Sequence, residues 1–144
     1  MSSFAVVLDA AAFDSLDSQR STGMRALLRR AIDDGDEVRC AAVTLAEVCR
    51  GVARTRVVEA ALARRRGGQR IRVVPTDERF AKLVGAILRD TGSGSERIAD
   101  AHVIAACATV DTALVLTADP DDIAALATAI PGTRIVTRDP SSPL

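Results

Sequence analysis

Short apolar runs alternate along the chain with longer segments in which apolar side chains recur at helical spacing. The runs are rich in Val, Leu and Ile and end at polar or turn residues, which is typical of buried strands. We expect strands at residues 4–8, 38–43, 71–74, 113–116 and 134–136. The longer segments predict helices at residues 10–16, 22–34, 45–52, 78–90, 96–108 and 120–130. Strand and helix in alternation predict an α/β fold, with helices on both faces of a mainly parallel sheet.

The chain is expected to form one domain. It has 144 residues, no internal repeat and no linker long enough to separate two domains. We place the domain at residues 1–137 and a loose tail, rich in Pro and Ser, at residues 138–144. No apolar run approaches the roughly 20 residues that cross a bilayer. Since a secretory signal is also missing from the start, we expect a cytoplasmic protein without membrane contact.

Carboxylates follow the predicted strands. Asp9 comes directly after the first strand, Asp119 comes shortly after the fourth, and Glu47 lies one turn into the helix after the second. Ligands of open α/β sheets bind outside the carboxyl ends of the strands, so these acids are candidate site residues. Each also has a structural explanation, because Asp9 and Asp119 suit helix N-caps and Glu47 can pair with Arg50.

Asp100 lies in the most apolar of the predicted helices, beside Ile98, Val103 and Ile104. An unpaired charge buried there costs several kcal/mol. Asp100 is therefore expected to pair with an arginine, to be protonated or to bind a cation. The single histidine, His102, is expected on a different side of this helix and is left out of the chemistry.

Arg and Asp supply most of the charge. The net charge is zero, but 18 of the 19 cations are Arg and 14 of the 19 anions are Asp. Arg binds phosphate through two hydrogen bonds and Asp is a hard oxygen ligand, so a nucleic-acid partner and a metal are both compatible with this composition. Converging carboxylates suit Mg²⁺ or Mn²⁺ rather than Zn²⁺. The three cysteines, Cys40, Cys49 and Cys107, are expected to be reduced core residues.

Four motifs together resemble a known family. They are Val7-Leu8-Asp9-Ala10, Thr44-Leu45-Ala46-Glu47-Val48, Ala99-Asp100-Ala101-His102-Val103-Ile104-Ala105-Ala106 and Leu116-Thr117-Ala118-Asp119. In this order and spacing, over practically the whole chain, they resemble the PIN-domain ribonucleases and specifically the VapC-type toxins of bacterial toxin–antitoxin pairs. The resemblance implies a PIN fold and an endoribonuclease that depends on Mg²⁺ or Mn²⁺ and leaves a 5′-phosphate. It also implies a homodimer, inhibited by a small VapB-type antitoxin whose basic or bulky tail enters the acidic site.

The resemblance also implies roles for particular residues. The implied catalytic residues are Asp9, Glu47, Asp100 and Asp119, of which the three aspartates hold the metal and Glu47 acts largely through water. Thr117 matches a hydroxyl residue commonly found beside the last acid. The family often has one further acid here, and spacing along the chain does not decide between Asp121 and Asp122. We choose Asp121 as the additional metal ligand because it can share the crevice of Asp119. Asp122 is then expected only to complete the start of the helix, which Pro120 already favours.

An RNA substrate needs cations beside this acidic site to offset repulsion. The candidates are Arg50, Arg54, Arg64, Arg65 and Arg66. Such a basic cluster is also often only a solvated face. The only aromatic residues of the Phe, Tyr and Trp types are Phe4, Phe13 and Phe80, all expected in the core, so recognition should use RNA shape and backbone rather than base stacking.

Two other functions fit part of the pattern. A binding module would keep the fold and the acids without cleaving RNA. A phosphoacceptor of the receiver or haloacid-dehalogenase type also uses an Asp after the first strand with Mg²⁺. The receiver type needs a Lys near a late strand, but Lys82 is the only Lys and is expected in mid-helix, while Ala11 stands where the dehalogenase type has a second acid.

Overall fold

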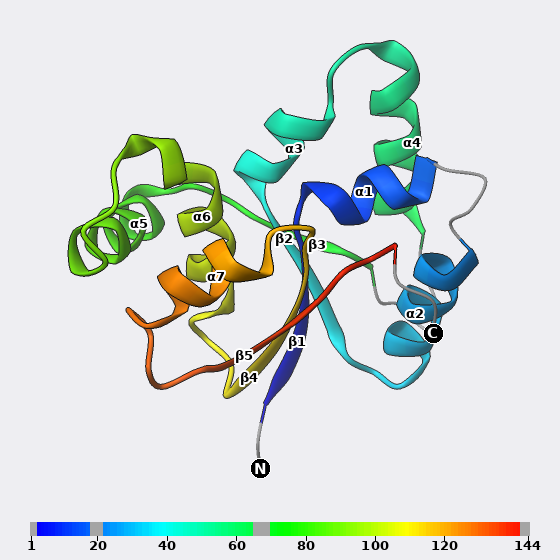
Figure 1. The fold of residues 1–144 in the computed structure, drawn as a ribbon. Coiled ribbons are helices and arrows are strands. Elements are labelled where there is room, and N and C mark those ends of the chain that lie inside the picture. Colours follow the sequence, from blue (N-terminus) through cyan, green and yellow to red (C-terminus); the bar gives the residue numbers. More distant parts are fainter. Residues whose placement is uncertain (1–2, 18–21, 65–69, 142–144) are drawn as a thin grey trace.

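A computed structural model describes residues 3–17, 22–64 and 70–141 (Figure 1). Within these residues, five parallel strands form one sheet in the order β3-β2-β1-β4-β5. The strands are β1 Phe4–Leu8, β2 Glu37–Ala41, β3 Arg72–Val74, β4 Thr112–Leu116 and β5 Arg134–Arg138. The helices are α1 Ala10–Asp17, α2 Thr22–Asp33, α3 Ala42–Val48, α4 Val52–Ala63, α5 Glu78–Asp90, the 3₁₀ turn η1 Ser95–Arg97, α6 Ile98–Cys107 and α7 Pro120–Ala127. The α/β fold class predicted from the sequence is confirmed.

The central strands are buried on both faces because successive side chains point to opposite sides of the sheet. Ala5 and Val7 of β1 belong to a core that includes residues of α5, α6 and α7. Val6 and Leu8 belong to a second core, which α1, α2 and α4 close. Figure 1 shows these two groups of helices on opposite sides of the sheet. The continuous apolar run of β1 therefore reflects two cores that share one strand.

The boundary between the second strand and the next helix differs from the prediction. β2 ends at Ala41, and Ala42 and Val43, expected in the strand, begin α3. Thr44 is not the helix cap: it lies within α3, fully buried, and its hydroxyl has no hydrogen-bond partner among the described residues. The apolar run continues across the boundary because strand and helix are both buried, so hydrophobicity alone does not mark where one ends.

The single helix expected at residues 45–52 is interrupted. α3 ends at Val48, and α4 begins at Val52 after Gly51, whose φ of 97° is unfavourable for residues with a side chain. Further along, the helix expected from residue 96 starts as the 3₁₀ turn η1 before α6. At the end of the described chain, β5 includes Arg138, so the sheet extends one residue into the segment predicted as tail.

The strand order determines where a ligand can bind. From β1 the chain continues to β2 on one side of the sheet, whereas β4 pairs with β1 on the other side. The order thus reverses between β1 and β4, and the crevice outside the carboxyl ends of two such strands is the usual ligand site of open α/β sheets.

Two further observations concern surface and thiol chemistry. No helix within the described residues is long and apolar enough to span a membrane.

Cys40, Cys49 and Cys107 are free, and burial raises the pKa of Cys40 and Cys107 to about 12. These two thiols are therefore protonated core side chains, as the sequence predicted.

Candidate active site

Asp9 and Thr117 join the carboxyl ends of β1 and β4. The Asp9 side chain is almost completely buried, and its two oxygens accept hydrogen bonds from the Ala10 amide at 2.7 Å and from the Thr117 hydroxyl at 2.7 Å. The Thr117 oxygen also accepts a hydrogen bond from the Asp119 amide at 3.0 Å. Thr117 is fully buried, so it has one fixed orientation that links the first acid to the turn carrying Asp119.

Asp119 is not used as a helix cap. It occupies the residue before α7, but its side chain makes no capping hydrogen bond, and the residue is exposed. An Asp at this position ordinarily accepts a hydrogen bond from the first turn of the helix. The carboxylate of Asp119 is therefore left available beside Thr117, and the structural explanation considered for it is not realised.

Asp100 extends from α6 toward the same strand ends. Its pKa is raised to about 6, first by partial burial and then by the charges of Asp9, Asp122 and Asp119, against the opposing charge of Arg97. Asp100 forms no ion pair with a described residue, so the Asp–Arg pair that could have explained it is not found in this part of the chain. Burial and three nearby carboxylates thus raise the pKa of Asp100 by more than Arg97 lowers it.

Glu47 contributes a further acid from α3. Its pKa is raised by burial, then by the charges of Asp9 and Asp100, and is lowered by Arg50. The Arg50 guanidinium does not pair with Glu47: its Nε donates to the Ala46 carbonyl at 3.0 Å. Strand ends and helices thus bring together the acid cluster, defined as Asp9, Glu47, Asp100, Asp119 and Asp122.

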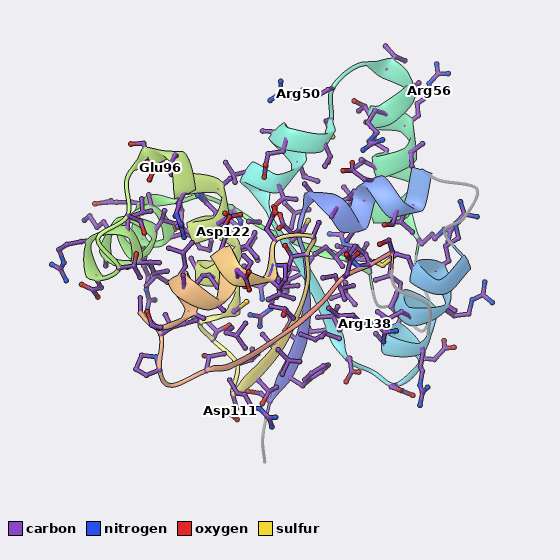
Figure 2. All side chains as sticks on the ribbon, in the orientation of Figure 1. Arg50, Arg56, Glu96, Asp111, Asp122 and Arg138 are labelled. Atoms are coloured by element: carbon purple, nitrogen blue, oxygen red, sulfur yellow. The ribbon has the colours of Figure 1, made fainter. Side chains whose placement is uncertain are left out.

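Asp122, rather than Asp121, takes part in this cluster. Asp122 is half-buried, raises the pKa of Asp100, and its Oδ1 lies 3.5 Å from the Arg97 guanidinium. Asp121 is exposed and contributes to neither shift. Adjacent residues of a helix point in directions about 100° apart. Figure 2 shows Asp122 at the start of α7 and next to α6.

The structure gives the predicted RNA-binding arginines different surroundings. Arg50 projects from the α3–α4 connection (Figure 2), beside a hollow of about 510 Å³ that Glu47 also lines. Arg54 lines the same hollow but is ion-paired with Asp14 between α4 and α1. Arg64 lines a different cavity, and Arg65 and Arg66 lie outside the described residues. Both Arg50 and Arg54 therefore lie beside Glu47, and Arg50 makes no ion pair with a described residue.

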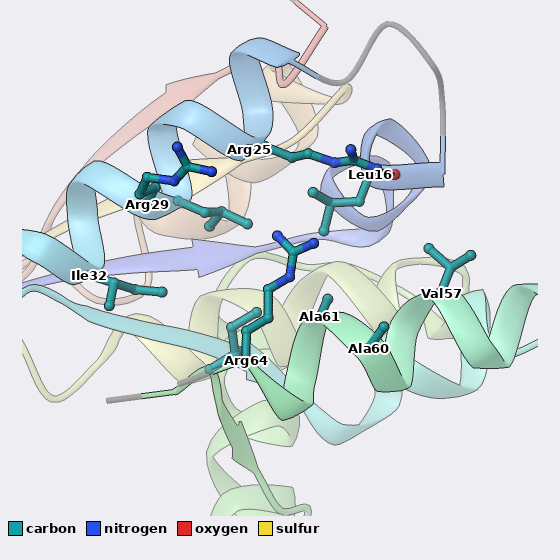
Figure 3. Close-up of a pocket in the computed structure, with 10 residues that line it drawn as sticks. Leu16, Arg25, Arg29, Ile32, Val57, Ala60, Ala61 and Arg64 are labelled. Carbon is teal, nitrogen blue, oxygen red and sulfur yellow. Dashed lines mark hydrogen bonds between the residues drawn. The ribbon is translucent and has the colours of Figure 1, made fainter. Parts of the chain in front are cut away.

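The cavity lined by Arg64 lies between α2 and α4 (Figure 3), and no residue of the acid cluster lines it. It has a volume of about 670 Å³, with Arg25 and Arg29 of α2 on one side and Arg64 at the end of α4 on the other. Leu16, Leu28, Ile32 and Ile71 contribute apolar surface. Because it holds no acid and no nucleophile, this cavity is not a candidate for the chemistry.

The acid cluster fits a hard divalent cation by donor type and charge. Its donors are carboxylate oxygens, which Mg²⁺ and Mn²⁺ prefer. The pKa values of Glu47 and Asp100 are raised first by burial and then by neighbouring negative charge, which a cation would offset. Within the described residues, no three such side chains are already close enough together to hold a metal ion. The structure therefore supplies the ligand types at one place, without a preformed coordination shell.

The lysine that a phosphoacceptor of the receiver type requires is not near the acids. Lys82 lies on α5, exposed, and its ammonium pairs with Glu78 at 2.7 Å within the same helix. This geometry leaves the phosphotransfer alternative without its cation.

Comparison with known proteins identifies the architecture. The family model described as "PIN domain" matches residues 6–139. The structure is similar to a chain in the crystal structure of VapBC2 from Rickettsia felis bound to a DNA fragment from their promoter, with a TM-score of 0.64 and 14% identity. The match covers 94% of this chain and 99% of that chain. A search of curated proteins gave no significant match.

Proposed function

The chain belongs to the PIN-domain family, and from this premise we propose that it is a metal-dependent endoribonuclease, the toxin of a toxin–antitoxin pair. The observation that carries the proposal is the acid cluster at the point where the strand order reverses, where burial and then the charges of neighbouring acids raise the pKa of Asp100 to about 6. Acids arranged only for stability are ordinarily paired or used as caps. Among the described residues, Asp100 and Asp119 are neither paired nor used as caps.

In this proposal Asp9, Asp100 and Asp119 hold Mg²⁺ or Mn²⁺, with Asp122 in place of Asp121 as the additional acid. When bound, the ion lowers the pKa of an attacking water and stabilises the charge that develops on a phosphodiester. Thr117 fixes the orientation of Asp9 through its 2.7 Å hydrogen bond. Glu47, whose pKa is raised by burial and by the charges of Asp9 and Asp100, is proposed to act through a water molecule.

The substrate is proposed to be RNA held by its backbone. Arg50 offers a guanidinium beside Glu47 without a carboxylate partner among the described residues. Phe13 is buried, Phe80 packs against His102 with ring centroids 5.8 Å apart, and Phe4 lies at the opposite end of the sheet. No phenylalanine is therefore beside the acids to stack on a base, which favours recognition of phosphates and RNA shape, as in a structured tRNA or rRNA.

The remaining parts of the proposal concern partners and place of action. We propose a VapB-type antitoxin as inhibitor, a homodimer as the free form and the cytoplasm as the site of action. The support is the PIN family and a fold shared with a chain of a VapBC2 complex.

The decisive test is cleavage of RNA by the purified protein. Wild type, Asp100→Asn and Asp90→Asn are incubated with total RNA in Mg²⁺ or Mn²⁺, with and without EDTA. We expect the wild type and Asp90→Asn, which removes an exposed acid of α5, to cut RNA only with the metal, and Asp100→Asn to be inactive. Cleavage that persists in EDTA or in Asp100→Asn overturns the proposal. RNA binding without cleavage by the wild type assigns the chain to the binding-module alternative.

A further inference from the structure

Arg97 is a cation held against the acid cluster. It is the last residue of η1, directly before α6, and one of its terminal nitrogens lies 3.5 Å from Oδ1 of Asp122. Its charge also opposes the carboxylates that raise the pKa of Asp100. Arg97 therefore offsets part of the negative charge on the α6 side of the cluster, as Arg50 does near Glu47.

The contact between Arg97 and Asp122 is loose. Its 3.5 Å separation exceeds the 2.7–2.9 Å that is usual for a charge-assisted hydrogen bond. The two side chains are 36% and 48% exposed, so water screens the attraction. By contrast, Arg39 lies 2.7 Å from Glu37 with a side chain that is only 7% exposed. The Arg97 guanidinium is thus weakly bound to Asp122. Breaking this contact to bind another anion therefore has a small free-energy cost.

We infer that Arg97 changes partner during RNA binding: when the acid cluster holds a divalent cation, the Arg97 guanidinium leaves Asp122 and binds a phosphate of the RNA backbone. This inference rests on the proposed function. With such an ion bound, Arg97 would face a larger positive charge than its own, and the acids would no longer need Arg97 for neutralisation. Arg97 then lies at the rim of a site whose substrate carries one negative charge per nucleotide, and a guanidinium is well suited to bind phosphate.

If Arg97 exchanges partners in this way, its substitution should change the affinities for Mn²⁺ and for RNA in opposite directions. In Arg97→Gln a competing cation is lost, so Mn²⁺ should bind about two- to fivefold more tightly, which is the range for a screened ion pair. RNA should bind more weakly to the metal-loaded variant because one phosphate contact is lost. If Arg97 had only a structural role, Arg97→Gln would weaken both Mn²⁺ binding and RNA binding.

The experiment measures the two affinities separately. Mn²⁺ binding is followed by calorimetry without RNA. RNA binding is followed by fluorescence anisotropy with a short fluorescein-labelled single-stranded RNA, in Ca²⁺ or in EDTA, at several KCl concentrations, and a gel verifies that the RNA stays intact. Losing one phosphate contact should reduce the slope of log affinity against log salt by about 0.7 in Ca²⁺. In EDTA, where Asp122 retains Arg97, the slopes of wild type and variant should agree.

Two controls separate this role from charge and folding effects. Arg89→Gln removes the same charge from an exposed pair on α5, with Asp90 at 2.9 Å, and should change neither Mn²⁺ affinity nor the slope. Arg97→Lys keeps the charge and should keep the wild-type slope, even where Arg97→Gln folds poorly. The inference is overturned if Arg97→Gln weakens Mn²⁺ binding, leaves the slope in Ca²⁺ unchanged, or changes it equally in EDTA. If the wild type binds no Mn²⁺ and cuts no RNA, the proposed function itself fails.

Discussion

The two ends of the sheet use the same kinds of charged residue in opposite ways. At the amino end, Arg39 is buried and donates to the Glu37 carboxylate at 2.7 Å, to the Ala106 carbonyl at 3.0 Å and to the Thr109 hydroxyl at 2.6 Å. Arg72 adds a second contact to Glu37 at 3.1 Å. The Arg39 hydrogen bond accordingly lowers the pKa of Glu37, against the effect of burial.

At the carboxyl end the acids are crowded and their cations are loosely held. The pKa values of Glu47 and Asp100 are raised, and the nearest ion pair, Arg97 with Asp122, has a separation of 3.5 Å. Figure 2 shows the two ends marked by Asp111 and Asp122. The comparison indicates that the charged residues at the amino end stabilise the fold. At the carboxyl end, negative charge stays uncompensated and is available to bind a ligand.

The largest expected effect is on catalysis. Asp9→Asn keeps the size of the side chain but removes the charge that we assign to metal binding, and RNA cleavage should fall by at least about 100-fold. Glu37→Gln, the matched change at the other end of the sheet, should retain activity. Initial cleavage rates at saturating Mg²⁺ measure both. Comparable cleavage rates for Asp9→Asn and wild type would show that the charge of Asp9, at the carboxyl end of the sheet, is not needed for cleavage.

The next effect is on stability at the amino end. Arg39→Met removes a buried cation and leaves the acceptors on Glu37, Ala106 and Thr109 without their donor, which should cost about 3 kcal/mol of unfolding free energy. Arg72→Gln removes an exposed partner of the same Glu37 and should cost less than about 1 kcal/mol. Urea denaturation of the two variants provides the measurement. Equal losses would show that burial does not distinguish the two arginines.

Thr117→Val tests the hydrogen bonds that link the carboxyl ends of β1 and β4. The substitution preserves the shape but removes the donor to Asp9 and the acceptor of the Asp119 amide, which should cost about 1–2 kcal/mol of stability. Activity should fall about tenfold or more, since Asp9 loses its fixed orientation. Thr117→Ser retains the hydroxyl and should recover most of both. If serine does not rescue activity, the hydrogen bond is not what positions Asp9.

Asp100→Asn should make the metal-free protein more stable. A carboxyl group whose pKa is higher in the folded than in the unfolded state destabilises the fold when ionised, so the penalty exists above about pH 6 and disappears toward pH 4. With allowance for solvent screening, the gain at pH 8 should be about 1 kcal/mol. Thermal unfolding in EDTA at pH 8 and pH 4.5 measures it. A loss of stability at pH 8 would contradict the crowding of the acid cluster.

Glu37→Gln should give the opposite pH dependence and the smallest effect. The pKa of Glu37 is lowered in the folded protein, so its contribution is present above its unfolded pKa and is lost as the pH falls. Because Glu37 is partly exposed, the cost at pH 7 should be below about 1 kcal/mol. Denaturation of wild type and variant from pH 7 to pH 3 should show curves that converge at low pH. A difference that persists at pH 3 would exclude the charge as its cause.

The sequence predicts the positions of the acids better than their surroundings. Asp9 and Asp119 were predicted at one edge because parallel strands end on the same side, and the structure places both beside Thr117. Their assignment as metal ligands stays a prediction. The choice between Asp121 and Asp122 depends on the rotational phase of α7, which is set by packing of Ile123 and Leu126 in the core. Without that packing, spacing along the chain does not select one acid.

The cations were harder to predict, because their roles depend on distant contacts. Arg54 was expected to bind RNA, but it pairs with Asp14 of another helix. Arg97 was not identified, although its position three residues before Asp100 is the spacing of neighbours on a helix face. Arg39 lies in a short strand beside Cys40 and Ala41, and nothing local distinguishes it from a solvent-exposed arginine. An arginine in such a strand can only be assigned once its partners are known, here Ala106 of α6, Thr109 and Glu37 of the same strand.

The hydrogen bond between Asp9 and Thr117 joins residues 108 positions apart. Strand β4 also completes the middle of the sheet, since it pairs with β1 along its whole length. During synthesis on the ribosome, the nascent chain consequently has no organised acid cluster until β4 and Asp119 have been translated. Fragments from interrupted translation that end before residue 112 lack this strand and cannot assemble the cluster.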